Sequence, residues 1–299
     1  MVHTPGQRKH ARRVSTKIAH GRGRRILQLQ NFEPLVYVVV WHRSDQFSRF
    51  GGWSFPKGSW VHESKSMKLS IIIPVYNECA TIVQLIERLK HSDVAGFEWI
   101  FVDDGSTDGT TKLLHENVPS NQKLIVQPTN QGKSAAVRAG LLEATGEWII
   151  VQDADLEYNP SEIPRLLERA LASKTQPVAV YGRRPSYWHR PSRWVFALGV
   201  LGIDLAFVVV YRRWIRDHAS CYKLVPRELL QSFDLQASGF EGCVEITAKL
   251  MLIRTPIISV PIGYVPRRIA EGKKLTMSYG FTALEALWHY RKWKLAKVA

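Results

Sequence analysis

The chain has 299 residues, of which 45% are hydrophobic, 22% charged and 10% aromatic, and its formal net charge is +15. This is the composition of a folded globular protein, and it excludes a disordered chain, a collagen-like chain and a small disulfide-stapled domain. The three cysteines show no Cys-x-x-Cys spacing, which argues against a structural zinc site and suits a reducing cytoplasm, so we expect free thiols.

The positive charge is concentrated at the start of the chain. Residues 1–66 hold 12 Lys and Arg against 3 Asp and Glu, whereas residues 67–299 hold 29 against 23. Because residues 1–66 show no sustained hydrophobic period, we expect a mostly unstructured basic extension that can be attracted to any polyanion. The alternatives are a helical lipid-binding arm, or a start codon upstream of a functional beginning at Met67. Only a short apolar patch follows the basic residues, so no secretory signal is evident and we expect no export.

From Met67 onward, short β-branched apolar runs alternate with amphipathic stretches. Strands are expected over residues 69–74, 99–102, 124–127, 148–152 and 178–182, and helices over residues 81–91, 107–115, 133–145 and 161–173. Strands that are apolar throughout and are separated by helices indicate parallel βαβ units, whose sheet is buried on both faces. We therefore predict a doubly wound, Rossmann-like α/β domain over residues 67–299, with a mostly parallel sheet flanked by helices.

Polar residues follow four of these strands at the point where each strand ends. The four loops are Pro74 to Glu78, Asp103 to Gly109, Thr129 to Lys133 and Asp153 to Glu157. Because a doubly wound sheet binds its ligand beyond the carboxyl ends of its strands, we expect these loops to meet at one edge. Five acidic residues stand directly after apolar strands, and these are Glu78, Asp103, Asp104, Asp153 and Asp155. Such a cluster is unfavourable unless a cation or hydrogen-bond donors compensate it, so this edge is the predicted ligand site.

The sequence Asp153-Ala154-Asp155 places two carboxylates one residue apart at a strand end. Carboxylates are the hard oxygen ligands that Mg²⁺ or Mn²⁺ prefers, and a substrate diphosphate can complete the coordination of either ion. Capping of a helix by an aspartate is the alternative interpretation.

The sequence from Asp103 to Ser106 also has two interpretations. Asp-Gly and Ser-Thr-Asp-Gly form turns and helix caps, but carboxylates at a strand end can also accept hydrogen bonds from ribose hydroxyls or base N–H groups. No Gly-x-Gly-x-x-Gly follows the first strand, and Gly-x-x-x-x-Gly-Lys-[Ser/Thr] is absent. Dinucleotide and P-loop sites are therefore excluded.

The longest apolar stretch runs from Trp194 to Tyr211. It approaches the ~20 residues of a bilayer span, but Asp204 lies near its middle and arginines stand at both ends. A spanning helix is one of three interpretations, beside a buried helix and a helix at the lipid interface with its arginines among the head groups.

In this order and spacing, the four loop motifs resemble those of the inverting family 2 glycosyltransferases of GT-A fold. The motifs are Ile72-Ile73-Pro74-Val75-Tyr76-Asn77-Glu78, Val102-Asp103-Asp104-Gly105-Ser106-Thr107-Asp108-Gly109-Thr110, Asn130-Gln131-Gly132-Lys133 and Gln152-Asp153-Ala154-Asp155-Leu156-Glu157-Tyr158-Asn159-Pro160. The resemblance implies a GT-A fold, with additional strands and helices in the C-terminal half.

The distal half is similar to the polyprenyl-phosphate sugar synthases, such as the dolichol-phosphate mannosyltransferases. The similar segments are Tyr181 to Arg184, Asp217 with Cys221-Tyr222-Lys223, Gly239-Phe240-Glu241, Glu245 to Leu250, Val260 to Arg267 and Glu271 to Lys274. Two departures stand out. Ala197 replaces a serine that relatives often place near the acceptor phosphate, and the sequence shows no pair of hydrophobic spans before Ala299. We therefore expect a form that reaches its lipid by interfacial contact, from the cytoplasmic side and as a peripheral membrane protein.

The resemblance also implies a role for individual residues. Pro74, Tyr76 and Glu78 would hold the nucleotide base, Asp103 or Asp104 the base or ribose, and Lys133 and Asp153 the rest of the nucleotide sugar. Asp153, Asp155 and Glu157 would hold Mg²⁺ or Mn²⁺, and Arg184, Arg193, Arg267 and Lys273 would contact donor or acceptor phosphates. Asp153, Asp155, Arg184 and Arg267 are the implied catalytic set, because guanidinium groups match phosphate oxygens and carboxylates hold the metal.

The implied reaction is the inverting transfer of a sugar, with mannose from GDP-mannose favoured over UDP-sugars, to a polyprenyl or dolichyl phosphate at the membrane surface. A phosphate monoester is largely dianionic at neutral pH, so this acceptor needs no strong general base. One alternative is a family 2 transferase that uses Glu241 or Glu245 as the base for a hydroxyl acceptor. Nucleic-acid binding by the basic extension is the other alternative, but it leaves the carboxylate-bearing loops without a task, so no nucleic acid is expected.

Overall fold

The computed structural model describes residues 69–185, 194–267 and 278–295, together with three short strands nearer the start of the chain. The chain divides into two compact units, residues 1–63 and 64–299. In the first unit, an antiparallel sheet is formed by β1 (Ile18–Gly21), β2 (Arg24–Leu27) and β3 (Val38–Val40). Most of residues 1–66 lie outside the described residues, so the expected basic extension and its boundary at Met67 stay predictions.

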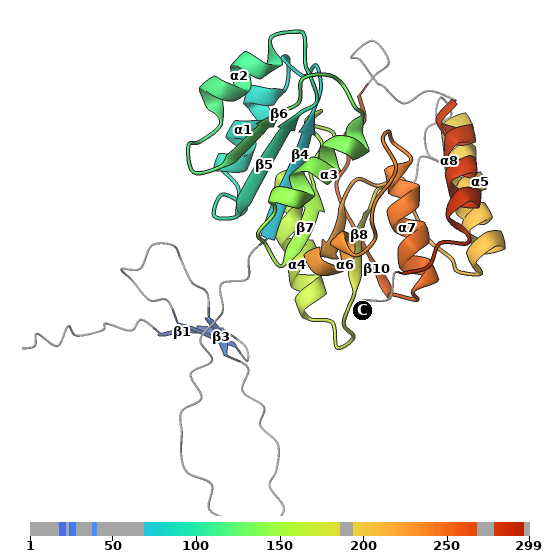
Figure 1. The fold of residues 1–299 in the computed structure, drawn as a ribbon. Coiled ribbons are helices and arrows are strands. Elements are labelled where there is room, and N and C mark those ends of the chain that lie inside the picture. Colours follow the sequence, from blue (N-terminus) through green and yellow to red (C-terminus); the bar gives the residue numbers. More distant parts are fainter. Residues whose placement is uncertain are drawn as a thin grey trace, which may run out of the picture. The chain divides into compact units, whose positions relative to one another are not determined.

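The second unit is built on a seven-stranded sheet (Figure 1). Its strands are β4 (Leu69–Val75), β5 (Glu98–Asp103), β6 (Lys123–Val126), β7 (Trp148–Val151), β8 (Ala179–Arg183), β9 (Lys223–Pro226) and β10 (Ile257–Pro261). They lie in the order β10-β8-β9-β7-β4-β5-β6. Neighbouring strands are parallel except at β9, which runs antiparallel to both β7 and β8. The predicted doubly wound, mostly parallel sheet is confirmed.

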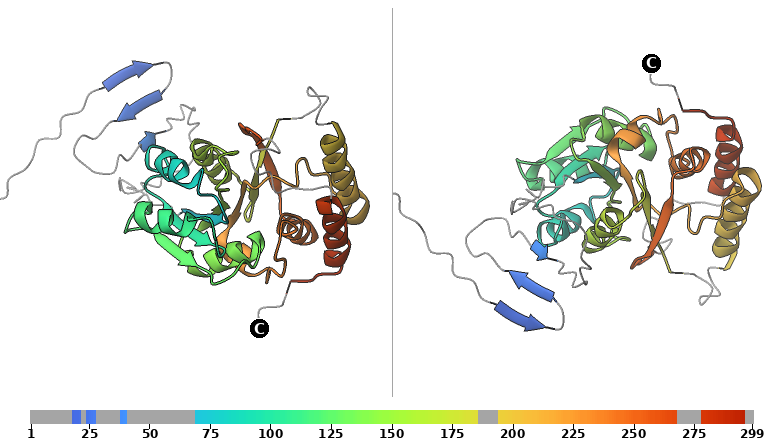
Figure 2. Two further views of the ribbon diagram at one scale, coloured as in Figure 1. Left: turned by 90° about the horizontal axis from the view of Figure 1, so that it is seen from above. Right: turned by 90° about the horizontal axis from the view of Figure 1, so that it is seen from below.

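Helices cover both faces of this sheet (Figure 2). They are α1 (Ile82–Lys90), α2 (Thr110–Asn117), α3 (Lys133–Glu143), the 3-10 turn η1 (Pro160–Glu162), α4 (Ile163–Leu171), α5 (Trp194–Tyr211), α6 (Arg227–Gln231), α7 (Gly242–Leu252) and α8 (Ser278–Tyr290). Helices α1, α2 and α4 share a core with one face of the sheet, and α3 and α7 share a core with the other. On that second face, α7 lies between the sheet and the pair formed by α5 and α8.

The inner strand β4 shows why these strands are apolar throughout. Ile71 and Ile73 pack into the core with α1, whereas Ile72 between them packs into the opposite core with α3. All three side chains are fully buried. Since successive side chains of a strand point to opposite faces, both faces must be apolar, and each such burial contributes roughly 1.5–3 kcal/mol.

The reversed direction of β9 determines which residues reach the carboxyl edge of the sheet. In a parallel strand, the residues that follow the strand lie at this edge, but in β9 the residues that precede it do so. Gly182 N at the end of β8 donates to Tyr222 O just before β9, at 2.8 Å. The segment from Asp217 to Tyr222 therefore lies beside the ends of β7 and β8, where Cys221 contacts Asp153 and Asp217 contacts Arg184.

Helix α5 corresponds to the apolar stretch that the sequence singled out. It packs beside α8, as both views of Figure 2 show. Its Asp204 is buried, with 6% of its surface exposed. Within the described parts of the chain, no helix has both the length and the apolar character needed to cross a bilayer.

Gly132, which precedes α3, offers a test of how the loop after β6 is positioned. Its φ of 95° is unfavourable for other residues, and a Cβ added there would lie 2.5 Å from Ser238 O. We expect Gly132→Ala to lower the free energy of unfolding by about 2–4 kcal/mol, measured by urea denaturation. Gly109→Ala is the matched control, because Gly109 has a φ of 94° but an added Cβ would meet nothing within 4 Å. Equal losses for the two variants would show that the contact with Ser238 is unimportant.

Candidate functional site

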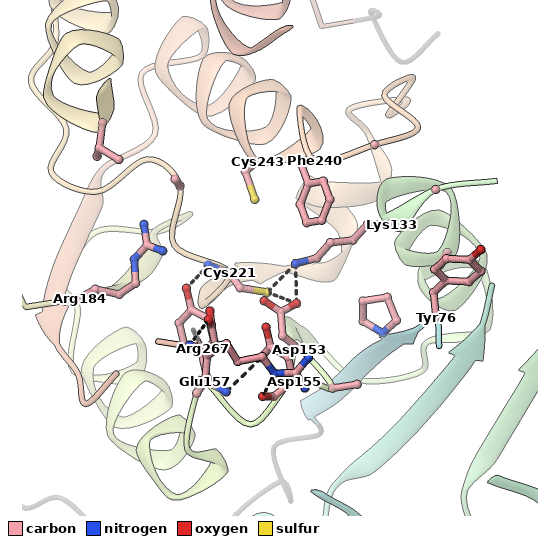
Figure 3. A pocket seen from close by; sticks show the side chains of 18 of the residues that line it. Tyr76, Lys133, Asp153, Asp155, Glu157, Arg184, Cys221, Phe240, Cys243 and Arg267 are labelled. Atoms are coloured by element: carbon pink, nitrogen blue, oxygen red, sulfur yellow. Dashed lines mark hydrogen bonds and ion pairs between the residues drawn. The ribbon is translucent and has the colours of Figure 1, made fainter. Parts of the chain in front are cut away.

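The carboxyl edge of the sheet opens onto a cavity of about 700 Å³. Ten predicted site residues line it, and these are Pro74, Tyr76, Glu78, Asp104, Lys133, Asp153, Asp155, Glu157, Arg184 and Arg267. Figure 3 shows the acidic residues and Lys133 at the end of the sheet, with Arg184 on another wall. Arg193 and Lys273 lie outside the described residues. The four loops meet as predicted.

The paired aspartates after β5 have different surroundings. Asp103 is fully buried and does not line the cavity, because its carboxylate accepts hydrogen bonds from Ser106 N at 3.0 Å and Thr111 Oγ1 at 2.5 Å. Asp104 does line the cavity, and its two oxygens accept hydrogen bonds from the backbone N–H groups of Gln131 and Gly132, at 2.7 and 2.8 Å. Asp103 thus stabilises the turn before α2, whereas Asp104 connects the end of β5 to the loop after β6.

Asp153 stands at the centre of the acidic wall. Its Oδ1 forms an ion pair with Lys133 Nζ at 2.5 Å and accepts a hydrogen bond from Cys221 Sγ at 3.1 Å. Burial lowers the pKa of Lys133, but the Asp153 carboxylate outweighs it and raises that pKa well above its ordinary value. Burial and Asp153 both raise the pKa of Cys221, so this thiol stays protonated and donates. Lys133 therefore brings a fixed positive charge to the cavity.

Asp155 carries a negative charge that the surrounding protein compensates poorly. Its burial, together with the charges of Asp153 and Glu157, raises its pKa to about 7. Oδ1 accepts a hydrogen bond from Glu157 N at 3.0 Å, and no Lys, Arg or His among the described residues forms an ion pair with this carboxylate. A cation beside Asp153 and Asp155 would relieve this unfavourable charge.

The residues fit a divalent ion only if a ligand supplies further oxygens. Within the described ranges, no group of three or more His, Cys, Asp and Glu side chains is arranged to hold a metal ion. Asp153 and Asp155 provide hard oxygen donors on one wall, and Mg²⁺ and Mn²⁺ commonly take their remaining ligands from water and substrate phosphates. The donor set is therefore compatible with a metal that binds together with a diphosphate.

Glu157, the third predicted metal ligand, is engaged by the loop that follows β10. Oε1 accepts a hydrogen bond from Arg267 N at 2.7 Å, Oε2 accepts one from the Tyr264 hydroxyl, and the Glu157 carbonyl accepts one from Val265 N at 3.0 Å. These contacts fasten the loop over the cavity. The geometry favours this anchoring role, and the proposed metal contact of Glu157 stays a prediction.

Arg267 connects that loop to the start of the domain. Its Nη2 forms an ion pair with Glu78 Oε2 at 2.7 Å, and its Nε donates to the carbonyl of Asp155 at 2.8 Å. Glu78 is therefore held by an arginine in this structure, whereas the family resemblance implied that it would hold the nucleotide base. The loop after β4 and the loop after β10, almost two hundred residues apart, form one side of the cavity.

Arg184 is held rigidly on another wall. Its Nε donates to Asp217 Oδ2 at 2.9 Å, its Nη2 lies 2.5 Å from Asp217 Oδ1, and its guanidinium lies 5.1 Å from the centre of the Tyr264 ring. Burial raises the pKa of Asp217, but Arg184 outweighs this and holds the pKa below its ordinary value. A bidentate pair of this kind fixes the plane of the guanidinium.

The cavity continues between α5 and α8, where its lining becomes apolar. This part is lined by Gly199, Val200, Gly202, Ile203, Gly280, Phe281 and Leu284. The outer surface of the same helices exposes large apolar side chains, among them Val209 at 79% and Trp288 at 60%. Phe240 and Cys243 also line the cavity. The sequence assigned no site role to these two residues or to the glycines, although Phe240 lies in one of the segments that carry the family resemblance. The sequence does not show that they share one cavity, because the cavity is formed by elements far apart in the chain.

The two glutamates considered as bases for a hydroxyl acceptor, Glu241 and Glu245, form hydrogen bonds with backbone N–H groups outside the cavity. Glu245 is fully buried, and its oxygens accept hydrogen bonds from Gln236 N at 2.8 Å and Ala237 N at 2.9 Å. Glu241 Oε1 accepts hydrogen bonds from the backbone N–H groups of Ser238 and Gly239. Neither residue lines the cavity. Both shape the loop that carries Phe240.

Comparison with known proteins relates this geometry to a family. Residues 70–232 match the family described as "Glycosyl transferase family 2". An undecaprenyl-phosphate 4-deoxy-4-formamido-L-arabinose transferase of Proteus mirabilis is 31% identical over 215 residues, which are 70% of this chain and 63% of that protein. A dolichol-phosphate mannosyltransferase of Pyrococcus furiosus is 29% identical over 236 residues, which are 76% of this chain and 65% of that protein. The chain thus spans less than two thirds of the length of these relatives.

Solved structures show the same architecture. Glucosyl-3-phosphoglycerate synthase of Mycobacterium tuberculosis, in complex with Mg²⁺ and UDP, has a TM-score of 0.58 at 20% identity, covering 75% of this chain and 79% of that one. The same enzyme with Mn²⁺, UDP-glucose and phosphoglyceric acid has a TM-score of 0.55, also at 20% identity, covering 76% and 80%. At this identity the likeness shows the fold, which is the predicted GT-A fold.

Proposed function

Since the chain belongs to glycosyl transferase family 2, we propose that it transfers a sugar from a nucleotide sugar to a polyprenyl phosphate, with inversion of the anomeric carbon. The observation that carries this proposal is a single cavity with two unlike walls. Carboxylates and Lys133 line the wall at the sheet edge, whereas Arg184 and the apolar part between α5 and α8 line the other. A nucleotide sugar and its metal suit the charged wall, and a lipid phosphate suits the wall with an arginine and apolar side chains. The two substrates must lie side by side for the transfer.

The donor is proposed to bind along the sheet edge. Tyr76 and Pro74 offer the base an apolar and aromatic surface, and Asp104 lies where it can face the ribose. Lys133 supplies a positive charge for the diphosphate. Asp153 and Asp155 would hold Mg²⁺ or Mn²⁺, which would offset the negative charge that grows on the departing nucleoside diphosphate.

Metal binding is expected to depend on pH through Asp155. Its pKa of about 7 in the metal-free protein means that the carboxyl is protonated at lower pH, and a protonated carboxyl is a poor ligand. Affinity is therefore lost as the pH falls through 7, and we expect the Kd for Mn²⁺ in the presence of UDP to be about tenfold higher at pH 6 than at pH 8. Calorimetric titration measures this change. Asp155→Asn should bind weakly with little pH dependence, and an unchanged wild-type Kd across this range would contradict the assignment.

The acceptor phosphate is proposed to lie near Arg184 and Arg267, with its isoprenoid chain between α5 and α8. An oxygen of the phosphate forms a bond to the anomeric carbon as the bond from that carbon to the donor diphosphate breaks. The diphosphate leaves with the bonding electrons, and one displacement inverts the centre. Because the nucleophile arrives as a dianion, positioning by the arginines takes the place of a general base. The engagement of Glu241 and Glu245 with backbone N–H groups agrees with this.

Mannose from GDP-mannose is the favoured donor. The name of the P. furiosus mannosyltransferase supports mannose as the sugar, whereas that of the arabinose-derivative transferase supports a different sugar. The test incubates the full chain with Mn²⁺, a polyprenyl phosphate and labelled GDP-mannose or UDP-sugars, followed by extraction into organic solvent. Label in the organic phase from one donor identifies it. Transfer only to free sugar acceptors would contradict a lipid phosphate acceptor.

Peripheral contact with the cytoplasmic face of a membrane is proposed on the exposed side chains of α5 and α8. Apolar side chains flanked by cations, here Arg212, Arg213 and Arg291, suit the lipid interface. Flotation of the full chain with anionic liposomes tests this. Val209→Glu with Trp288→Glu should reduce the bound fraction, and wild-type protein left entirely in the unbound fraction would contradict the proposal.

A further inference from the structure

Asp204 is an acidic residue in the otherwise apolar helix α5, and its carboxylate is used fully within the protein. Oδ1 lies 2.6 Å from His218 Nδ1, and His218 is itself fully buried. Oδ2 accepts a hydrogen bond from Asp217 N at 3.3 Å, and Oδ1 accepts one from His218 N at 3.4 Å. A buried carboxylate with these partners fixes the position of the turn that provides them.

That turn has a conformation which needs support. Asp217 has a φ of 63°, in the left-handed region that residues with a side chain seldom adopt. The Asp204 carboxylate accepts hydrogen bonds from the backbone N–H groups of Asp217 and His218, and it also contacts the imidazole of His218. On the far side, Lys223 Nζ donates to the carbonyl of His218 at 2.8 Å. The turn is therefore held between α5 and β9.

The turn at Asp217 also fixes the position of Arg184. Asp217 accepts hydrogen bonds from both the backbone N and the side-chain Nε of Arg184, each at 2.9 Å, and pairs with Nη2 at 2.5 Å. An unbroken series of contacts thus runs from the Asp204 carboxylate through one turn to a guanidinium that lines the cavity.

We propose that Asp204 is a positioning residue for the acceptor: it holds the Asp217 turn in its left-handed conformation and thereby sets the direction in which Arg184 faces the acceptor phosphate. That Arg184 faces an acceptor phosphate rests on the proposed function. That Asp204 positions Arg184 rests on the contacts described above. Asp204 does not line the cavity. Because it belongs to α5, whose outer surface is apolar, the position of this helix is linked directly to the phosphate-facing arginine.

The experiment compares full-length Asp204→Ala and Asp204→Asn with Leu205→Ala, a neighbouring residue of α5 that is 48% exposed. NMR of ¹⁵N-labelled protein follows the Arg184 Nε–H, whose signal is assigned with Arg184→Lys. We expect slow exchange with solvent in the wild type and in Leu205→Ala, loss of the slow signal in Asp204→Ala, and an intermediate rate in the isosteric Asp204→Asn.

Steady-state kinetics provide the second measurement. We expect Asp204→Ala to raise the KM for polyprenyl phosphate at least fivefold, with the KM for the nucleotide sugar within twofold of wild type, and Asp204→Asn to fall between. Asp204 variants with a wild-type Nε–H signal, or with an unchanged acceptor KM, would overturn the inference. If the wild type transfers no sugar to the lipid, the proposed function fails, while the NMR comparison still decides whether Asp204 positions Arg184. If Asp204→Ala does not fold, Asp204→Asn carries the same test.

Discussion

Asp153→Asn is expected to lower kcat/KM for sugar transfer by about 10²–10³-fold, a loss of the size that follows removal of one well-placed electrostatic contact. The substitution keeps the volume of the side chain but removes the charge that pairs with Lys133 and, in the proposed function, holds the metal. It leaves the Lys133 ammonium without the carboxylate that keeps its pKa high. Transfer of labelled sugar into the organic phase measures the loss.

The matched control is Glu87→Gln, which also removes a carboxylate charge but on an exposed part of α1, outside the cavity. It should retain activity within twofold of the wild type. Circular dichroism and thermal melting of both variants establish that they fold. Wild-type activity in folded Asp153→Asn would show that the Asp153 carboxylate takes no part in the reaction.

The largest expected effect on stability comes from Lys249→Met. Lys249 and Glu245 are both fully buried and form an ion pair at 2.6 Å on α7. The ammonium also donates to the carbonyls of Phe233 at 2.7 Å and Asp234 at 3.1 Å. Removing the cation leaves a buried carboxylate and two carbonyls without their partner, so we expect a loss of about 3–5 kcal/mol in the free energy of unfolding, measured by urea denaturation.

Lys112→Met provides a control with the same spacing. Lys112 and Glu116 are also four residues apart on a helix, but Lys112 is 81% exposed and the charged atoms lie 3.8 Å apart. Exposed pairs contribute about 0–1 kcal/mol, so this variant should be near wild type. A similar small loss for Lys249→Met would mean that the interior around α7 readmits water.

The strands and helices of the first half of the domain could be predicted from the sequence, because their hydrophobic periods and the polar residues at strand ends mark them. Each predicted strand is present, and the helix expected over residues 107–115 differs mainly in its start at Thr110. The difference has a local cause, because Asp108 Oδ1 accepts a hydrogen bond from Thr110 N at 3.0 Å and Gly109, the residue before the helix, adopts a φ of 94°. Turn residues look alike whether they precede a helix or begin it, so composition alone does not locate that boundary.

Within the candidate site, the sequence predicted which loops meet but not what each carboxylate does. Asp103 and Asp104 are adjacent and chemically equal, yet only Asp104 faces the cavity, since successive residues leaving a strand point in opposite directions. The pairing of Glu78 with Arg267 and of Asp204 with His218 depends on contacts between distant segments. No spacing rule reveals such contacts, because they are created only when the sheet and its flanking helices assemble.

The antiparallel strand β9 also bears on how such a protein can acquire new specificity. The excursion that begins after β8 and contains α5 leaves the sheet and returns to it at the same edge, at the Gly182–Tyr222 hydrogen bond. A segment whose two roots are adjacent can be lengthened or exchanged without changing the order of the strands. In the proposed function, the acceptor side of the cavity can therefore change separately from the donor side, which is lined by the loops after β4, β5, β6 and β7.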